Sequence, residues 1–305
     1  MEPRWTAADI PDQRGRVALV TGANSGLGLV SATALARAGA TLLLACRDTA
    51  KGERARATIE HGEAQVIELD LADLASVRRC AAAVAERHPR LDLLINNAGV
   101  MAPPRRLTKD GFESQIGTNH LGHFALTGLL LEPLLAAQEA RVVTVSSGMH
   151  RIGKIAFDDL HGERSYRAWR AYGQSKLANL MFCFELQRRA TAAGTGLKSV
   201  AAHPGYAATN LQSASATRSY ELAMMSVANR VVAQSAEMGA LPSLFAATAP
   251  GLPGATFIGP DGFMEQRGYP HVVSAAPKAY DQTAWRRLWV VSEELTGVQY
   301  DFDRA

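Results

Sequence analysis

The feature of this sequence that most constrains its fold is a regular alternation of short apolar runs with longer amphipathic runs. The short runs are residues 17–20, 41–45, 66–69, 91–95, 141–145, 197–202 and 255–258. Strands that are apolar at every position are buried on both faces, which is typical of a parallel sheet with helices on each side. Because crossovers between parallel strands are right-handed, the pattern predicts a doubly wound α/β fold with a seven-stranded, mostly parallel sheet.

The composition is that of an ordinary globular protein, with 47% hydrophobic and 20% charged residues among 305. No linker rich in Pro, Gly or Ser divides the chain, so we expect one domain over residues 1–305. The formal net charge of +3 and the scattered basic residues argue against a nucleic-acid partner. Three widely spaced cysteines, Cys46, Cys80 and Cys183, predict neither a disulfide framework nor a zinc site, and we expect no metal.

Two features that the sequence lacks bear on the location of the protein in the cell. Residues 1–14 are polar and lack the apolar core of a signal peptide, and no run of about 18 apolar residues predicts a transmembrane span. The cysteines lie in apolar surroundings, which predicts buried, reduced thiols. We therefore expect a cytoplasmic location.

The first apolar run leads into a glycine-rich turn that indicates a dinucleotide site. The turn consists of Gly22, Ala23, Asn24, Ser25, Gly26, Leu27 and Gly28. Glycines permit a close approach of the backbone to a pyrophosphate, and the N-terminus of the following helix attracts its charge. Glycines also simply make turns, but their position between a strand and a helix favours a Rossmann-type cofactor site.

The spacing of these glycines, Gly-x-x-x-Gly-x-Gly, resembles the TGxxxGxG signature of the short-chain dehydrogenase/reductase family. Three further segments at the ends of predicted strands resemble motifs of the same family, and the set spans about residues 15–210. One of them, Asn96-Asn97-Ala98-Gly99, matches the NNAG motif. The resemblance implies that a nicotinamide dinucleotide also contacts Asp70, Leu71, Asn97, Ala98, Gly99, Tyr172, Lys176, Pro204, Gly205 and Thr209.

The end of the second apolar run bears on the choice of nicotinamide cofactor. There the sequence has Arg47, and an acidic residue, Asp48, follows one position later than the acid that selects NAD in this family. Arg47 offers a planar, permanently charged fork that suits a 2′-phosphate. We therefore expect NADP(H), while Asp48 leaves NAD(H) open. Lys51 is either a second phosphate ligand or a solvated lysine of the first helical turn.

A Tyr-x-x-x-Lys pair at the start of a long amphipathic run supplies the candidate chemistry. Tyr172 and Lys176 are four positions apart, so they share one face of a helix expected over residues 171–193. A nearby positive charge lowers the pKa of a phenol from its free value of about 10, and Tyr172 would then act as a general acid or base. Tyr166 also lies near this helix start but has no lysine four positions on.

Two further residues complete the catalytic set that the family resemblance implies. Ser147, the second serine after the fifth apolar run, would hydrogen-bond the substrate oxygen, with Ser146 as the alternative. Asn119 lies within a long predicted helix, where Asn is an unfavourable residue. The resemblance implies that it supports a proton-relaying water near the lysine. No carboxylate or cysteine accompanies His120 and His123 at ligand spacing, so we interpret them as packing or surface residues.

Several features resemble one branch of the family, that of the retinol dehydrogenases and protochlorophyllide reductases. Ser147 and Tyr172 are farther apart in sequence than in many compact family members, and residues 45–48, 119–124 and 172–180 also resemble this branch. The branch implies a bulky, lipophilic small-molecule substrate.

Apolar residues near this segment are candidates for the wall of a substrate pocket. We expect Phe157 and Trp169 to flank the pocket, and residues 209–235 to form either a mobile lid or ordinary helix packing. The apolar residues of that segment are Leu211, Tyr220, Leu222, Met224, Met225, Val227 and Val231. The extension over residues 259–305 has no expected role beyond covering the sheet edge or the pocket.

Alternatives stay open on both chemistry and assembly. A protein that keeps this fold but has lost the chemistry would serve as a cofactor sensor or scaffold, although such proteins usually lack the Tyr or the Lys that this chain retains. The glycine spacing disfavours a dehydratase or epimerase of the extended branch. Family members form a homodimer through two long helices, here residues 111–137 and 171–193, or remain monomers.

Overall fold

The computed structural model describes residues 4–206 and 234–302, and its central feature is an eight-stranded sheet in the order β3-β2-β1-β4-β5-β6-β7-β8. The strands are β1 (Val17–Thr21), β2 (Thr41–Cys46), β3 (Ala64–Glu68), β4 (Leu93–Asn96), β5 (Arg141–Val145), β6 (Lys198–Ala202), β7 (Phe257–Pro260) and β8 (Pro270–Val272). All neighbouring strands are parallel except β7 and β8. The strand order reverses between β1 and β4, where doubly wound sheets bind their ligands.

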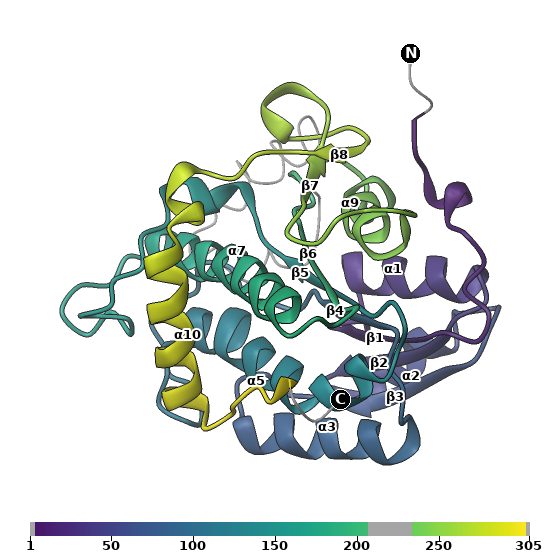
Figure 1. Ribbon diagram of the computed structural model, residues 1–305, viewed down its shortest axis with the longest axis horizontal. Coiled ribbons are helices and arrows are strands. Elements are labelled where there is room, and N and C mark those ends of the chain that lie inside the picture. The colour runs from purple at the N-terminus through teal and green to yellow at the C-terminus, as the bar shows by residue number, and fades with distance from the viewer. Residues whose placement is uncertain (1–3, 207–233, 303–305) are drawn as a thin grey trace.

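Helices cover both faces of the sheet because the strands are apolar on both faces. The helices are α1 (Gly26–Arg37), α2 (Thr49–Arg56), α3 (Leu74–Arg87), α4 (Ser114–Ile116), α5 (Gly122–Leu129), α6 (Leu131–Leu135), α7 (Ala168–Ala192), α9 (Ala236–Thr248) and α10 (Gln282–Thr296). Leu19 of β1 packs with α3, α5 and α7, whereas its neighbours Ala18 and Val20 pack with α1 and α9 (Figure 1). The doubly wound α/β fold expected from the sequence is confirmed.

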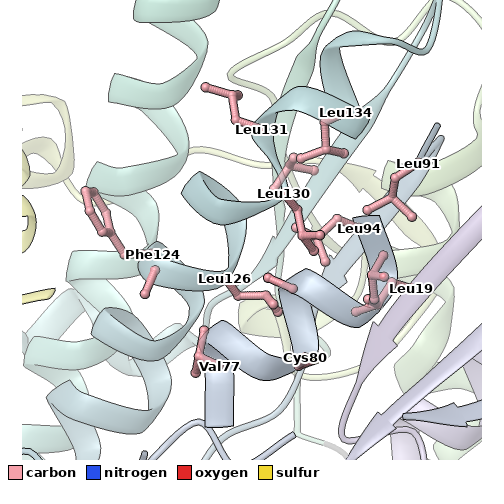
Figure 2. Close-up of a cluster of buried hydrophobic side chains, with 14 of the residues drawn as sticks. Leu19, Val77, Cys80, Leu91, Leu94, Phe124, Leu126, Leu130, Leu131 and Leu134 are labelled. Carbon is pink, nitrogen blue, oxygen red and sulfur yellow. The ribbon is translucent and has the colours of Figure 1, made fainter. Parts of the chain in front are cut away.

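The core on one face of the sheet lies against α3, α5 and α6. Figure 2 shows Leu19 and Leu94, from the neighbouring strands β1 and β4, together with Leu126 of α5. All three cysteines are buried, as expected. Burial raises the pKa of the Cys80 and Cys183 thiols to about 12, which keeps them protonated and unreactive at neutral pH.

The sheet has one strand more than the seven expected. β8 pairs antiparallel with β7, with Ile258 opposite Val272, and it comes from the extension beyond residue 259. A three-residue strand that begins with Pro270 is too short to show an alternating pattern, and proline is unusual inside strands. The extension therefore builds the edge of the sheet.

The single long helix expected over residues 111–137 is wrong. This stretch contains α4, a π-helical turn over Gly117–Leu121, α5 and α6. The break between α5 and α6 falls at Leu130 (φ −99°, ψ 11°), because Pro133 has no N–H with which to continue the helix. The π-helical turn contains Asn119, and turns of this kind are frequent at functional sites.

α10 and the residues after it cover the outward faces of α5 and α7 (Figure 1). Trp289 of α10 stacks on Phe182 of α7 with 5.9 Å between the ring centroids. The Tyr300 hydroxyl donates a hydrogen bond of 2.6 Å to the main-chain oxygen of Phe124. Residues 172–186 of α7 are consequently buried on every side. A homodimer through the two long helices would require α10 to leave this surface.

For two expectations, the outcome depends on which residues the structure describes. The lid expected over residues 209–235, and with it the cofactor residue Thr209, lies outside the described residues apart from Gln234 and Ser235. Within residues 4–206 and 234–302, none of the helices combines the length and the apolar character that crossing a membrane requires.

Replacing Trp289 by Ala tests how strongly α10 is held. The side chain is 2% exposed and contacts the rings of Phe124 and Tyr300, so its removal leaves a large cavity. We expect the variant to lose about 3–5 kcal/mol of unfolding free energy in urea denaturation. The neighbouring Val290 is 48% exposed, and Val290→Ala should change stability by less than about 0.5 kcal/mol. Equal losses in the two variants would contradict this packing.

Candidate active site

A cavity of about 560 Å³ opens at the carboxyl ends of the parallel strands, beside the reversal of strand order. The residues predicted from the sequence that line it are Gly22, Asn24, Ser25, Gly26, Leu27, Gly28, Arg47, Asp70, Leu71, Asn97, Ala98, Gly99, Ser147, Tyr172, Lys176, Pro204 and Gly205. The fold thus brings segments that are far apart in sequence to one cavity. Asn119 contacts the lining without belonging to it.

The glycine turn has a shape that accepts only glycine at three positions. Gly22 and Gly26 have φ angles of +68° and +55°, which residues with a side chain rarely adopt. A Cβ on Gly28 would lie 2.5 Å from the main-chain oxygen of Gly22 and 2.6 Å from the side-chain Nδ2 of Asn97. α1 begins within this turn, and the Ser25 side chain makes no capping bond to it. The N–H groups of the first turn therefore remain free to bind an anion.

Arg47, Asp48 and Lys51 follow the end of β2. The Asp48 carboxylate caps α2 by accepting a hydrogen bond of 2.9 Å from the main-chain nitrogen of Lys51. It also lies 3.4 Å from the Lys51 ammonium, and the capping bond is the main cause that lowers the pKa of Asp48. All three residues line the cavity. The Asp48 carboxylate is engaged by its own helix, and the exposed side chain of Arg47 lies just before that helix.

Tyr172 and Ser147 interact within the cavity. Ser147 is the N-cap of the 3₁₀ helix Gly148–Ile152, and its Oγ accepts a hydrogen bond of 3.2 Å from the Met149 nitrogen. Burial raises the pKa of Tyr172 to about 12, and a hydrogen bond with Ser147 opposes part of that shift. The phenol is therefore protonated at neutral pH.

Burial is the largest influence on the pKa of both Tyr172 and Lys176, and the effect of Lys176 on the phenol stays a prediction. The Lys176 Nζ lies 5.8 Å from the Tyr172 ring centroid and donates a hydrogen bond of 3.0 Å to the main-chain oxygen of Val145. Burial lowers the pKa of Lys176 itself to about 8. Ser146 has a different contact, since its hydroxyl donates to the main-chain oxygen of Lys176 (2.8 Å) and so ties β5 to α7.

Asn119 joins the loop after β4 to α7. Its Oδ1 accepts a hydrogen bond of 2.7 Å from the Val100 nitrogen. Its Nδ2 donates bonds of 2.9 Å to the Val100 oxygen and to the Ser175 hydroxyl. Because Val100 lines the cavity, the Asn119 side chain fixes part of the cavity wall.

The two histidines beside Asn119 are buried and neutral. Burial lowers the pKa of His120 to about 3 and that of His123 to about 4. His120 lies 3.0 Å from the Ser292 hydroxyl of α10, and His123 lies 2.9 Å from the Thr21 hydroxyl. Both are packing residues rather than surface residues. No cluster of three or more His, Cys, Asp and Glu side chains suited to a metal ion occurs among the described residues.

Apolar side chains form another part of the cavity wall. They are Met101, Met149, Trp169 and Tyr206. The Trp169 ring meets the Tyr172 ring edge-on with 6.2 Å between the centroids, which places an apolar wall beside the phenol. Sequence reasoning missed Met101 and Tyr206, whose only signal is that each closely follows a family motif.

Phe157 was expected at the pocket but lies elsewhere. It is not among the cavity-lining residues, and its ring packs under the guanidinium of Arg287 on α10 at 4.2 Å. Because a lone aromatic residue in an irregular segment has no periodic pattern, its sequence does not indicate which surface it covers.

This arrangement recurs in a known family. The family model for short chain dehydrogenase matches residues 16–219, which include the glycine turn, Ser147, Tyr172 and Lys176. The chain belongs to this family. Membership identifies the protein as an oxidoreductase of CH–OH and C=O groups that uses a nicotinamide cofactor.

Curated relatives within the family are retinol dehydrogenases. Retinol dehydrogenase 12 of Mus musculus is 41% identical over 291 residues, which cover 94% of this chain and 88% of the relative. Retinol dehydrogenase 13 of Homo sapiens is 40% identical over 293 residues, which cover 93% and 86%. The resemblance to the retinol dehydrogenase branch is confirmed.

Solved structures support the fold of this dehydrogenase. An uncharacterized protein from Mycobacterium Paratuberculosis is 48% identical with a TM-score of 0.83, over 98% of this chain and 100% of that chain. The Pseudomonas aeruginosa RhlG/NADP active-site complex is 25% identical with a TM-score of 0.67, over 87% and 100%. A relative with a similar fold thus binds NADP.

The low pKa of Lys176 gives a pH dependence of stability. An unfolded lysine titrates near 10.4, so between about pH 8 and that value the unfolded chain binds more protons and folding stability rises with pH. Lys176→Met removes this titration. In urea denaturation without cofactor, the free energy of unfolding of wild type relative to that of the variant should increase by about 3 kcal/mol between pH 7 and pH 10.5. A difference that does not change with pH would contradict it.

Proposed function

We propose that the protein is an NADP(H)-dependent oxidoreductase that interconverts a carbonyl and an alcohol on a bulky apolar substrate. The observation that carries this proposal is the pairing of Tyr172 with Ser147 beside the glycine turn, in one cavity. Such a reaction requires a proton donor and a dinucleotide-binding turn in the same cavity.

The residues present fit a dinucleotide. Gly28 allows α1 to approach the turn where a Cβ would collide with the main-chain oxygen of Gly22, and the free N–H groups of α1 suit a pyrophosphate. The guanidinium of Arg47 suits a 2′-phosphate, and the engagement of Asp48 with α2 supports NADP(H) over NAD(H). When bound, the cofactor supplies the hydride.

In the reduction direction Tyr172 donates the proton. Its pKa of about 12 keeps the phenol protonated at neutral pH, so a proton is ready for the substrate oxygen. The Ser147 hydroxyl, which bonds Tyr172, steadies that oxygen as negative charge develops on it. The Lys176 ammonium lies on the same helix face and stabilises the phenolate that remains. Oxidation of an alcohol is the same sequence reversed.

The cavity wall supports a lipophilic substrate. Met101, Met149 and Trp169 line the cavity near Tyr172, and methionines adapt to irregular apolar shapes. The curated relatives are named for retinol, so retinal-like aldehydes and steroid-like ketones are the first substrates to test.

Replacing Tyr172 by Phe tests the proton donor. Without the hydroxyl no group is placed to protonate the substrate oxygen, so NADPH-dependent reduction of retinal, followed at 340 nm, should fall by at least about a hundredfold. NADPH binding measured by calorimetry should stay nearly unchanged. Tyr166→Phe is the matched control, because the Tyr166 hydroxyl bonds the Pro103 oxygen. Turnover of the Tyr172 variant close to that of wild type would refute the assignment.

Replacing Arg47 by Ala tests the choice of cofactor. A lost hydrogen bond to a charged group is worth about 1.5–3 kcal/mol. The ratio of kcat/KM for NADPH to that for NADH should therefore fall roughly ten- to hundredfold. Arg54→Ala, on the helix α2 that follows Arg47 but outside the cavity lining, should leave the ratio unchanged. An unaltered ratio in the Arg47 variant would remove Arg47 from the 2′-phosphate site.

A further inference from the structure

The turn over residues 204–206, which lines the cavity, rests on the extension beyond residue 259. The Tyr206 nitrogen donates a hydrogen bond of 2.7 Å to the Gln266 oxygen. Gly205 has a φ angle of +63°, and a Cβ there would collide with the same Gln266 oxygen. Residues 263–266 therefore determine the shape of the cavity wall at this point.

Those residues hold an unusual backbone. Met264 and Glu265 have φ angles of +51° and +58°, and two successive left-handed residues with side chains are strained. The Met264 side chain is 73% exposed and gives no reason for this conformation. The contacts of Glu265 account for this conformation, because its carboxylate lies 3.0 Å from the His203 Nε2 and 2.9 Å from the Arg151 guanidinium.

His203 carries this contact to the cavity wall. Its side chain is 2% exposed, and its Nδ1 accepts a hydrogen bond of 3.3 Å from the Gly205 nitrogen. With Nδ1 as the acceptor, the proton of a neutral imidazole is on Nε2, which donates it to Glu265. The hydrogen bonds thus run from Gly205 through His203 to Glu265, and each partner fixes the orientation of the next.

We propose that Glu265 is a positioning residue for NADP(H), which acts through His203 to hold the 204–206 turn in its binding shape. The inference rests on the proposed function, since it takes this cavity to be the cofactor site. It gives the extension a role at the cavity that its sequence does not indicate.

The neighbouring residues Met264 and Glu265 offer a matched pair of variants. Met264→Gly and Glu265→Gly each remove one side chain and relieve one left-handed φ angle, but only Glu265→Gly removes the partner of His203. By calorimetry, Glu265→Gly should raise the Kd for NADPH at least about fivefold, because a charged hydrogen bond in the chain is lost. Met264→Gly should stay within about twofold of wild type.

A conservative variant separates positioning from general destabilisation. The amide oxygen of Glu265→Gln still accepts from the His203 Nε2, so its Kd for NADPH should return to within about threefold of wild type. Melting temperatures without cofactor show whether each variant is folded. A purely structural role would lower the melting temperature of Glu265→Gly and leave its Kd for NADPH unchanged, which would overturn the proposal.

Two other results would also be decisive. Equal Kd values for Glu265→Gly and Met264→Gly, or no recovery in Glu265→Gln, would overturn the positioning role while leaving the proposed function intact. If wild type bound neither NADPH nor NADH, the proposed function itself would fail, and the role of Glu265 with it.

Discussion

One buried hydroxyl, that of Thr21, joins the parts on which the cavity depends. It accepts hydrogen bonds of 2.9 Å from the nitrogens of both Asn97 and Ala98, which occupies its two lone pairs. Its proton has two acceptors, the His123 Nε2 at 2.9 Å and the Ile95 oxygen at 3.3 Å, and the His123 Nδ1 donates to the Asn119 oxygen at 3.0 Å. The end of β1, the loop after β4 and the π-helical turn are thus held in one arrangement. This arrangement of hydrogen bonds requires a neutral His123 imidazole, which agrees with the lowered pKa of His123.

Burial governs the protonation of the site more than the pairing of charges does. The same desolvation raises the pKa of Tyr172 and lowers that of Lys176, because each group is favoured in its uncharged form. A site built in this way holds a neutral proton donor at physiological pH. The balance follows from the depth of α7, which is enclosed by the sheet on one side and by α10 on the other (Figure 1).

The sequence predicted the parts of the molecule that have a local signal. Uniformly apolar runs locate the strands, and the spacing of Gly22, Gly26 and Gly28 locates the turn that lines the cavity. What it did not predict depends on contacts between distant segments or on desolvation. Glu265 meets His203 only because β7 and the turn after it lie beside β6. Neither that contact nor the depth at which Tyr172 is buried leaves a pattern in neighbouring residues.

The way α10 covers α5 and α7 has a consequence for biosynthesis. Chains fold progressively from the N-terminus as they leave the ribosome, and the strands up to β6 and the helices between them emerge before α10. Until α10 follows, the rings of Phe124 and Phe182, which Trp289 later covers, remain open to solvent. A nascent chain, or one cut short by a premature stop codon, would present this apolar surface to chaperones and proteases. Quality control would thereby act on molecules that already contain Ser147, Tyr172 and Lys176.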